Sequence, residues 1–180
     1  MLKYQDTLVT FTEVPDEISL CFNIANCPCG CQGCFEPWLA EDRGEPLTSA
    51  SVQRELLKHP HITCICWMGG DREPEALAAL TTMLRQNFPH LKFAMYSGRA
   101  QGVPALYEAL DYYKIGPYMP AFGPLNCRTT NQLFYKKVKN EWLDITSKFQ
   151  KEEKNYKKQK MNLTKKKLNM KMEKKRRKSS

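Results

Sequence analysis

Four of the eight cysteines in the chain lie within one stretch of eight residues: Cys27, Cys29, Cys31 and Cys34. Three of them have the spacing C-x3-C-x2-C, with glycines and a proline between them. A loop this short can direct three thiolates at one centre, because glycine accepts the positive φ angles of tight turns. On a [4Fe-4S] cluster, three thiolates would hold three irons and leave the fourth open to another ligand. We therefore predict a metal site at Cys27, Cys31 and Cys34.

Two other kinds of cysteine site are less favoured. A structural zinc site typically uses two C-x2-C pairs, but only Cys31 and Cys34 have that spacing, since Cys64 and Cys66 are one residue apart. A disulfide framework needs an oxidising compartment. The sequence begins without an apolar run of signal-peptide length, and no stretch is long and apolar enough to span a membrane. We expect a cytoplasmic protein with no membrane partner.

The hydrophobic pattern around the cysteines alternates between strands and helices. We predict strands at 18–24, 62–68, 91–96 and 112–115. Helices are predicted from Thr48 or Ser49 to about 59, from a cap at Asp71 to 87, and at 104–110. Leu57 and Met83 belong to the apolar sides of the first two helices. This order predicts an α/β fold with parallel strands. Four strands are too few for a closed eight-stranded barrel, so we expect an open, partial β/α barrel.

Outside this core, the sequence gives weaker signals. Residues 1–17 are mixed and end in a turn, and 36–47 are too broken by Pro and Gly to form a regular element. Residues 133–138 and 141–145 are predicted to pair as a C-terminal hairpin.

The charge separates a body from a tail. Of the 28 basic and 19 acidic side chains, 14 basic and 3 acidic ones lie in 151–180, so this segment carries +11 and the remainder −2. We predict one domain at 1–150 and a disordered Lys-rich tail at 151–180. A nearly neutral body argues against a nucleic-acid-binding fold, although the tail can contact phosphates by charge. We expect no nucleic acid partner.

Short polar segments follow the second and third predicted strands. Gly69 and Gly70 come directly after 62–68 and precede Asp71, and Ser97 comes after 91–96. Two glycines leave the backbone open to a ligand. A plain Gly-Gly turn and a polar strand end are the alternative interpretations.

The loop spacing, followed by the aromatic Phe35, resembles the cluster motif of the radical S-adenosylmethionine (SAM) enzymes. The resemblance implies a [4Fe-4S] cluster on the three cysteines, with SAM on the open iron. It also implies that a Gly-Gly-Glu-like segment, here ending in Asp71, binds the SAM amino group, and that Phe35 lies beside the adenine. Cofactor contacts are accordingly expected at Gly33, Cys34, Phe35, Gly69, Gly70, Asp71 and Ser97.

Residues 8–149 are similar to one subgroup, the anaerobic ribonucleoside-triphosphate reductase activating proteins, which are glycyl-radical-enzyme activases. The similarity is carried by 27–35, 67–71, 111–118 and 129–132. It implies reductive cleavage of SAM with electrons from a donor such as flavodoxin, and hydrogen abstraction from a glycine of the reductase. No protein acid or base is then needed, so no catalytic side chain is assigned. The alternatives are an activase of another glycyl radical enzyme, and a non-catalytic iron–sulfur or zinc module whose tail docks on nucleic acid.

The remaining cysteines are given structural roles. Cys29 breaks the ligand spacing, so we interpret it as a spectator, with an alternative ligand as the less favoured interpretation. Cys21, Cys64 and Cys66 alternate with core residues of predicted strands and are expected to pack in the core.

Overall fold

The computed structural model describes residues 1–150, and the predicted basic tail at 151–180 lies outside the described residues. The described part contains an open, mixed sheet in the order β3-β1-β2-β4-β5-β6-β7-β8. The strands are β1 (Lys3–Thr10), β2 (Ser19–Ile24), β3 (Glu45–Pro46), β4 (Cys64–Met68), β5 (Lys92–Tyr96), β6 (Tyr112–Ile115), β7 (Leu133–Val138) and β8 (Glu141–Asp144). The helices are α1 (Ser49–Lys58), α2 (Pro74–Asn87) and α3 (Pro104–Ala109), with short 3-10 turns η1 (Pro37–Ala40) and η2 (Thr146–Phe149).

The centre of the sheet is parallel and its margins are antiparallel. The pairings β2–β4, β4–β5 and β5–β6 are parallel. The pairings of β1 with β2 and β3, and of β7 with β6 and β8, are antiparallel. The α/β class and the open sheet are therefore confirmed. The four predicted strands pair in parallel as expected, but the sheet as a whole is mixed, because antiparallel strands flank the four central ones on both sides.

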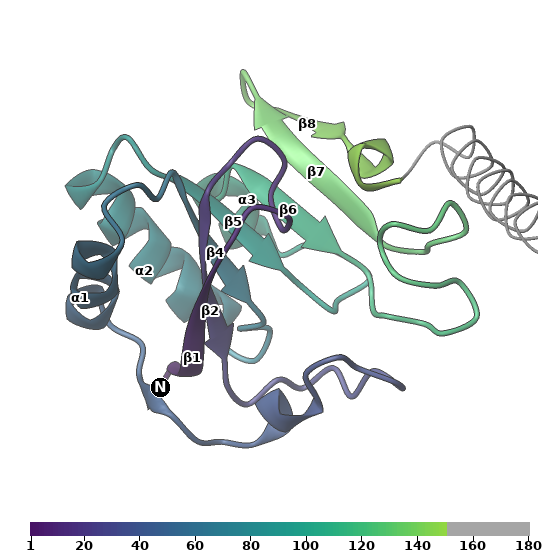
Figure 1. The fold of residues 1–180 in the computed structure, drawn as a ribbon, viewed down its shortest axis with the longest axis horizontal. Coiled ribbons are helices and arrows are strands. Elements are labelled where there is room, and N and C mark those ends of the chain that lie inside the picture. Colours follow the sequence, from purple (N-terminus) through teal and green to yellow (C-terminus); the bar gives the residue numbers. More distant parts are fainter. Residues whose placement is uncertain (151–180) are drawn as a thin grey trace, which may run out of the picture. The chain divides into compact units, whose positions relative to one another are not determined.

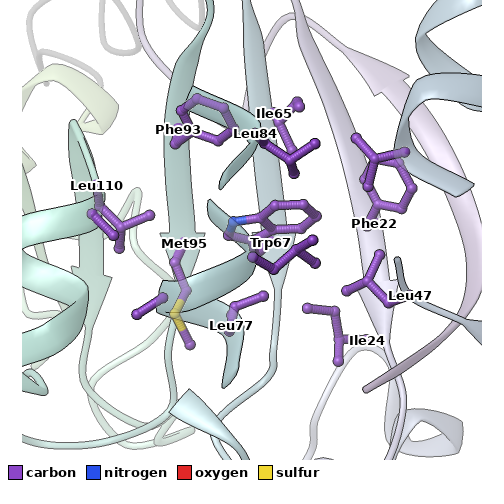
Figure 2. Close-up of a cluster of buried hydrophobic side chains, with 14 of the residues drawn as sticks. Phe22, Ile24, Leu47, Ile65, Trp67, Leu77, Leu84, Phe93, Met95 and Leu110 are labelled. Atoms are coloured by element: carbon purple, nitrogen blue, oxygen red, sulfur yellow. The ribbon is translucent and has the colours of Figure 1, made fainter. Parts of the chain in front are cut away.

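The three helices cover one face of the sheet, and Figure 1 shows α1 and α2 side by side. Alternate residues of the central strands point to this face, including Ile65 and Trp67 of β4. Trp67 is fully buried at the centre of the cluster drawn in Figure 2, and its indole N–H donates to the Thr81 hydroxyl at 3.0 Å. Burial of a whole indole stabilises the fold by about 3 kcal/mol or more.

The other face of the sheet is also buried, but no helix among the described α-helices covers it. Cys21, Cys64 and Cys66 point to this side and pack with Val14, Leu125 and Phe134 from loops and from β7. These three cysteines lie in the core, as predicted. Burial on both faces explains why the central strands read as nearly continuous apolar runs.

Most predicted elements are present, with errors at the margins. The Thr48 cap of α1 is confirmed: its hydroxyl accepts from the Ser51 N–H at 3.1 Å, and Ser51 completes a capping box. The hairpin of β7 and β8 is also confirmed. The sequence did not reveal β1, β3 or η1. Leu57 and Met83 are exposed, at 85% and 52%, although their spacing grouped them with core residues.

The helices of residues 1–150 are all too short or too polar to cross a bilayer; the longest, α2, has 14 residues.

Candidate functional site

The carboxyl ends of the four parallel strands meet at one edge of the sheet, which is where sites form in open α/β folds. The cysteine loop follows β2, the Gly69–Gly70 pair follows β4, Ser97 follows β5 and Gly116 follows β6. Parallel pairing therefore brings segments far apart in the sequence to one edge. The Gly69 N–H donates to the Tyr96 carbonyl at 3.1 Å, and the Ser97 N–H to the Lys114 carbonyl at 2.9 Å.

An open cavity of about 200 Å³ lies at this edge. Seven of the predicted site residues line it: Cys27, Cys31, Cys34, Phe35, Gly69, Asp71 and Ser97. Gly33 and Gly70 were predicted with them but are not part of the wall. Sites for small molecules usually have volumes of about 300–1,000 Å³, so this cavity is small for a nucleoside-sized ligand.

Asp71 is the most highly connected polar group at the cavity and is only 1% exposed. Its Oδ1 accepts from the Ser97 hydroxyl at 2.6 Å, and its Oδ2 accepts from the Gly98 N–H at 2.9 Å. The Arg99 guanidinium donates to the Asp71 carbonyl at 2.7 Å, and its Nε lies 3.7 Å from Oδ1. These donors replace the water that a buried carboxylate loses.

The predicted role of Asp71 as a helix cap is wrong. Helix α2 begins at Pro74, and its cap residue is Glu73, which makes no side-chain capping bond. Pro74 lacks an N–H that would need a partner, which reduces the need for a cap. The Asp71 carboxylate is thereby left to bind the end of the neighbouring strand instead.

Backbone hydrogen bonds fix the two ends of the cysteine loop. The Asn26 N–H donates to the Glu41 carbonyl at 3.1 Å, and the Cys27 N–H to the Leu39 carbonyl at 2.8 Å. Within the loop, the Cys34 N–H donates to the Cys31 carbonyl at 3.2 Å. Gly30 has φ +56° at the turn between the first and second halves of the loop, a conformation that costs other residues about 1–2 kcal/mol.

Cys27 and Cys29 form a close pair of thiols at the inner end of the loop. The hydrogen bond from Cys29 lowers the pKa of Cys27 to about 6, against the opposing effect of burial. The same contact with Cys27, together with burial and the nearby Asp71 charge, raises the pKa of Cys29. Cys29 thus keeps its proton, and this proton faces two acceptors, since its Sγ also lies 3.4 Å from Oδ2 of Asp71.

The donor chemistry of the loop suits iron, whereas its geometry is not yet that of a metal centre. Cys27, Cys31 and Cys34 are free thiols, and each lines the cavity. Thiolates are the ligands that iron–sulfur clusters require. Within residues 1–150, however, no three His, Cys, Asp or Glu side chains stand close enough to hold one metal ion. The donor set fits a cluster, and binding one requires the thiols to draw together.

The two positions after β4 require glycine for different structural reasons. Gly69 has φ +97° and lines the cavity, and a Cβ there would lie 3.2 Å from the Ile24 carbonyl oxygen. Gly70 has φ +96° and faces the core, where a Cβ would lie 2.6 Å from Leu77 Cδ2. The predicted ligand contact is thus supported by position at Gly69, while close packing accounts for Gly70.

Phe35 lies at the cavity with 75% of its surface exposed and contacts the Tyr118 ring at a centroid distance of 5.7 Å. Gly33 packs against the Tyr118 ring, since a Cβ at residue 33 would lie 3.5 Å from it. The cysteine loop therefore touches the loop after β6, and the two aromatic rings form one wall of the cavity.

Lys114 is a cavity residue to which the sequence led us to assign no role. It is 6% exposed, and its Nζ donates to the carbonyls of Gly116 at 2.6 Å and of Ser97 at 3.2 Å. Burial lowers its pKa to about 8, although nearby Cys31 and Asp71 favour the charged form. A lysine within the otherwise apolar run 112–115 was the available signal. Cys29 also lines the cavity, although the sequence led us to interpret it as a spectator.

Comparison with known proteins gives no relative. No protein-family model, curated protein or solved structure matches the chain. Family and activity therefore rest on the residues and the geometry described above.

Proposed function

We propose that the chain is a radical SAM activase that generates a glycyl radical on anaerobic ribonucleoside-triphosphate reductase. One observation carries the proposal. Three cysteines with C-x3-C-x2-C spacing line a single cavity together with Gly69, and they do so at the carboxyl ends of adjacent parallel strands. The proposal includes the finer assignment of the sheet as an open, partial barrel of the radical SAM type.

The cysteine loop would hold the cofactor. Cys27, Cys31 and Cys34 would ligate a [4Fe-4S] cluster, and SAM would take the remaining iron. When bound, this group would pass an electron from the external donor to SAM for its reductive cleavage, and hydrogen abstraction from a glycine would follow from that cleavage. The thiol with the lowered pKa, Cys27, is already disposed to act as a thiolate near neutral pH.

The remaining cavity residues would bind and orient SAM. The bare backbone of Gly69 allows close approach of the amino group, as the resemblance implies. Asp71 would act mainly through the second lone pair of its backbone carbonyl, which already accepts from Arg99, since its carboxylate is occupied by Ser97 and Gly98. Ser97 uses its proton for Asp71, so it would offer a ligand only its lone pairs. Phe35, exposed beside Tyr118, is placed where it can cover an adenine ring.

An open cavity favours a macromolecular substrate over a small one. Exposed apolar side chains lie in the cysteine loop and in the loop after β6: Phe35, Met119 and Phe122. Exposed apolar side chains near a cavity are typical of protein interaction sites. The proposed partners are the reductase, which presents the glycine, and an external electron donor such as flavodoxin.

The decisive experiment is low-temperature EPR on the full chain, purified without oxygen and reconstituted with iron and sulfide. We expect a reduced [4Fe-4S] signal that changes when SAM is added, together with 5'-deoxyadenosine in the reaction mixture. Iron binding without a response to SAM would leave an iron–sulfur module and contradict the enzymatic proposal. Tight binding of zinc in place of a cluster would contradict it as well.

The identity of the protein substrate needs a second measurement. Reduced, SAM-loaded protein should produce the glycyl radical doublet on anaerobic ribonucleoside-triphosphate reductase. A radical on another glycyl radical enzyme, with none on the reductase, would keep the activase class and replace the partner.

A further inference from the structure

Cys29 is the one cysteine of the loop that the ligand spacing does not use, yet its thiol faces the interior. Its Sγ lies 3.4 Å from Oδ2 of Asp71, which belongs to the segment after β4. The thiol therefore reaches from the loop after β2 to the neighbouring strand end. A spectator side chain on an exposed loop would have no reason to do so.

The acceptor of this contact, the Asp71 carboxylate, is held in place by other hydrogen bonds. Asp71 is buried, and the Ser97 hydroxyl and the Gly98 N–H both hold its carboxylate. A hydrogen bond to a charged acceptor is worth more than one between neutral groups. The loop is thus tied to a carboxylate that itself joins the ends of β4 and β5.

Gly98 provides the space into which Cys29 fits. A Cβ at residue 98 would lie 2.5 Å from the Sγ and 2.8 Å from the Cβ of Cys29, closer than such atoms approach in real structures. Gly98 is not among the residues with positive φ, so its backbone would accept other residues. The position excludes a side chain for reasons of space, and the space is taken by Cys29.

We propose that Cys29 is a positioning residue that fastens the cysteine loop to the ends of β4 and β5. In this role it keeps Cys27, Cys31 and Cys34 at the cavity before any metal is bound. The proposal relies on the proposed function only in regarding these three thiols as ligands. The fastening itself concerns the metal-free chain.

Hydrogen exchange of the metal-free full chain tests the fastening directly. Within 29–35 the Cys34 N–H donates to the Cys31 carbonyl, and we expect this amide to exchange about tenfold faster in Cys29→Ala than in the wild type. This factor is at the lower end for loss of a hydrogen bond to a charged acceptor, because a thiol is a weak donor. Cys29→Ser keeps a donor for Asp71 and should recover most of the protection. Cys127→Ala, which removes a thiol outside the loop, is the matched control and should leave 29–35 unchanged.

A double-substitution cycle tests the fit between the two residues. Gly98→Ala should displace the loop in the wild type and raise the exchange of 29–35 about as much as Cys29→Ala. In a Cys29→Gly background the added methyl group would meet Asp71 Oδ2 at the ordinary contact distance of 3.9 Å, so Gly98→Ala should change exchange less than about twofold. Equal effects of Gly98→Ala in both backgrounds, or unchanged exchange in Cys29→Ala, would overturn the proposal.

Iron loading separates this proposal from the proposed function. Cys29→Ala keeps all three proposed ligands and should reach the final iron content of the wild type, but at a lower rate of reconstitution. Faster exchange in Cys29→Ala, combined with a wild-type protein that binds no iron, would support the fastening and defeat the proposed function. Normal exchange in Cys29→Ala, combined with a SAM-responsive cluster in the wild type, would do the reverse.

Discussion

The hydroxyl of Ser97 donates a hydrogen bond of 2.6 Å to Oδ1 of Asp71, and this contact joins the ends of two adjacent parallel strands. Both side chains are about 1% exposed, so water cannot replace either partner. The contact lies directly beneath the cysteine loop, because the other carboxylate oxygen of Asp71 faces Cys29. Stability and the arrangement of the candidate site are therefore linked at one buried carboxylate.

Removing the Ser97 hydroxyl should destabilise the protein measurably. Ser97→Ala leaves Oδ1 of a buried carboxylate without its closest donor, which should lower the free energy of unfolding by about 1.5–3 kcal/mol. Urea unfolding followed by circular dichroism measures this change. Thr82→Ala is the control. The Thr82 hydroxyl donates to the backbone carbonyl of Ala78 rather than to a carboxylate, and it lies on an exposed helix face, so we expect a change within about 0.5 kcal/mol. Equal effects of the two substitutions would contradict the prediction.

Two glycine substitutions should differ in cost because only one glycine faces the core. Gly70→Ala introduces a Cβ 2.6 Å from Leu77 Cδ2 in addition to the strain of φ +96°, so we expect a loss of about 3 kcal/mol or more. Gly30→Ala meets nothing within 4 Å and carries only the strain of its positive φ, about 1–2 kcal/mol. Thermal unfolding of both variants checks the order. A Gly30→Ala protein less stable than Gly70→Ala would show that the core contact is not the dominant cost.

Burial of Lys114 should make stability depend on pH. Its pKa is about 8 in the folded protein and 10.5 as the unperturbed value, so between these values the unfolded chain binds more protons than the folded one. The contribution of Lys114 to the free energy of unfolding should therefore rise with pH in this range, from a penalty on the order of 3 kcal/mol below pH 8. The Cys29, Cys64 and Cys66 thiols act in the opposite direction, because their pKa values are raised above the ordinary 9.0 in the folded chain, so a comparison with a variant is needed to isolate Lys114. Lys114→Met keeps the length of the side chain and removes the titration. The free energy of unfolding of the variant minus that of the wild type should fall from about pH 8 to about pH 10 in urea unfolding. A constant difference would refute the prediction. The range ends there because burial raises the pKa of Tyr112 well above its ordinary value of 10.0, so ionisation of this residue in the unfolded chain lowers stability at higher pH.

Single cysteine substitutions should separate the proposed ligands from other thiols. Cys31→Ala should lose the reconstituted cluster and the cleavage of SAM, because two thiolates cannot hold three irons of a cube. Cys127→Ala, outside the cysteine loop, should keep both. Iron and sulfide content per chain and the yield of 5'-deoxyadenosine are the measurements. A Cys31→Ala protein with full activity would sink the assignment of the ligands.

The turn between β7 and β8 offers a stabilising substitution. Lys139 and Asn140 have φ values of +49° and +69°, the pattern of a two-residue type I′ turn, in which lysine is strained. Lys139→Asn should raise the free energy of unfolding by about 0.5–1 kcal/mol, since asparagine tolerates this conformation. Lys139→Ala, which does not relieve the strain, should give no such gain in the melting temperature.

The central elements were predictable because their residues are buried in regular patterns. Strands β4, β5 and β6 are short apolar runs, and α1 is preceded by Thr48, a residue type that commonly caps helices. β1 lacked such a signal: Leu8 is 60% exposed, whereas polar neighbours are half-buried, because an antiparallel flanking strand packs only in part. Its pairing with β2 depends on long-range contacts rather than on local pattern.

At the site, residue types were easier to predict than contacts. The ligand spacing and the glycines correctly indicated the edge of the sheet at which the site lies, because the carboxyl ends of the parallel strands meet there. The partners of Asp71 depend on where two separate strand ends meet, which spacing cannot reveal. Lys114 was overlooked, and the contact of Cys29 with Asp71 was not foreseen, for the same reason. The buried lysine is tolerated because two carbonyl oxygens from different loops accept hydrogen bonds from its Nζ.

The antiparallel register of β7 has a practical consequence for handling the protein. Leu133 pairs with Ile115 at the carboxyl end of β6, so β7 runs away from the cavity and its turn at residues 139–140 lies at the opposite edge of the sheet. A short affinity tag inserted in this turn would therefore sit away from the cysteine loop and would avoid thiol chemistry, which would also modify the exposed Cys34. The protein can be tethered by this turn with the cavity edge of the sheet left open to solution.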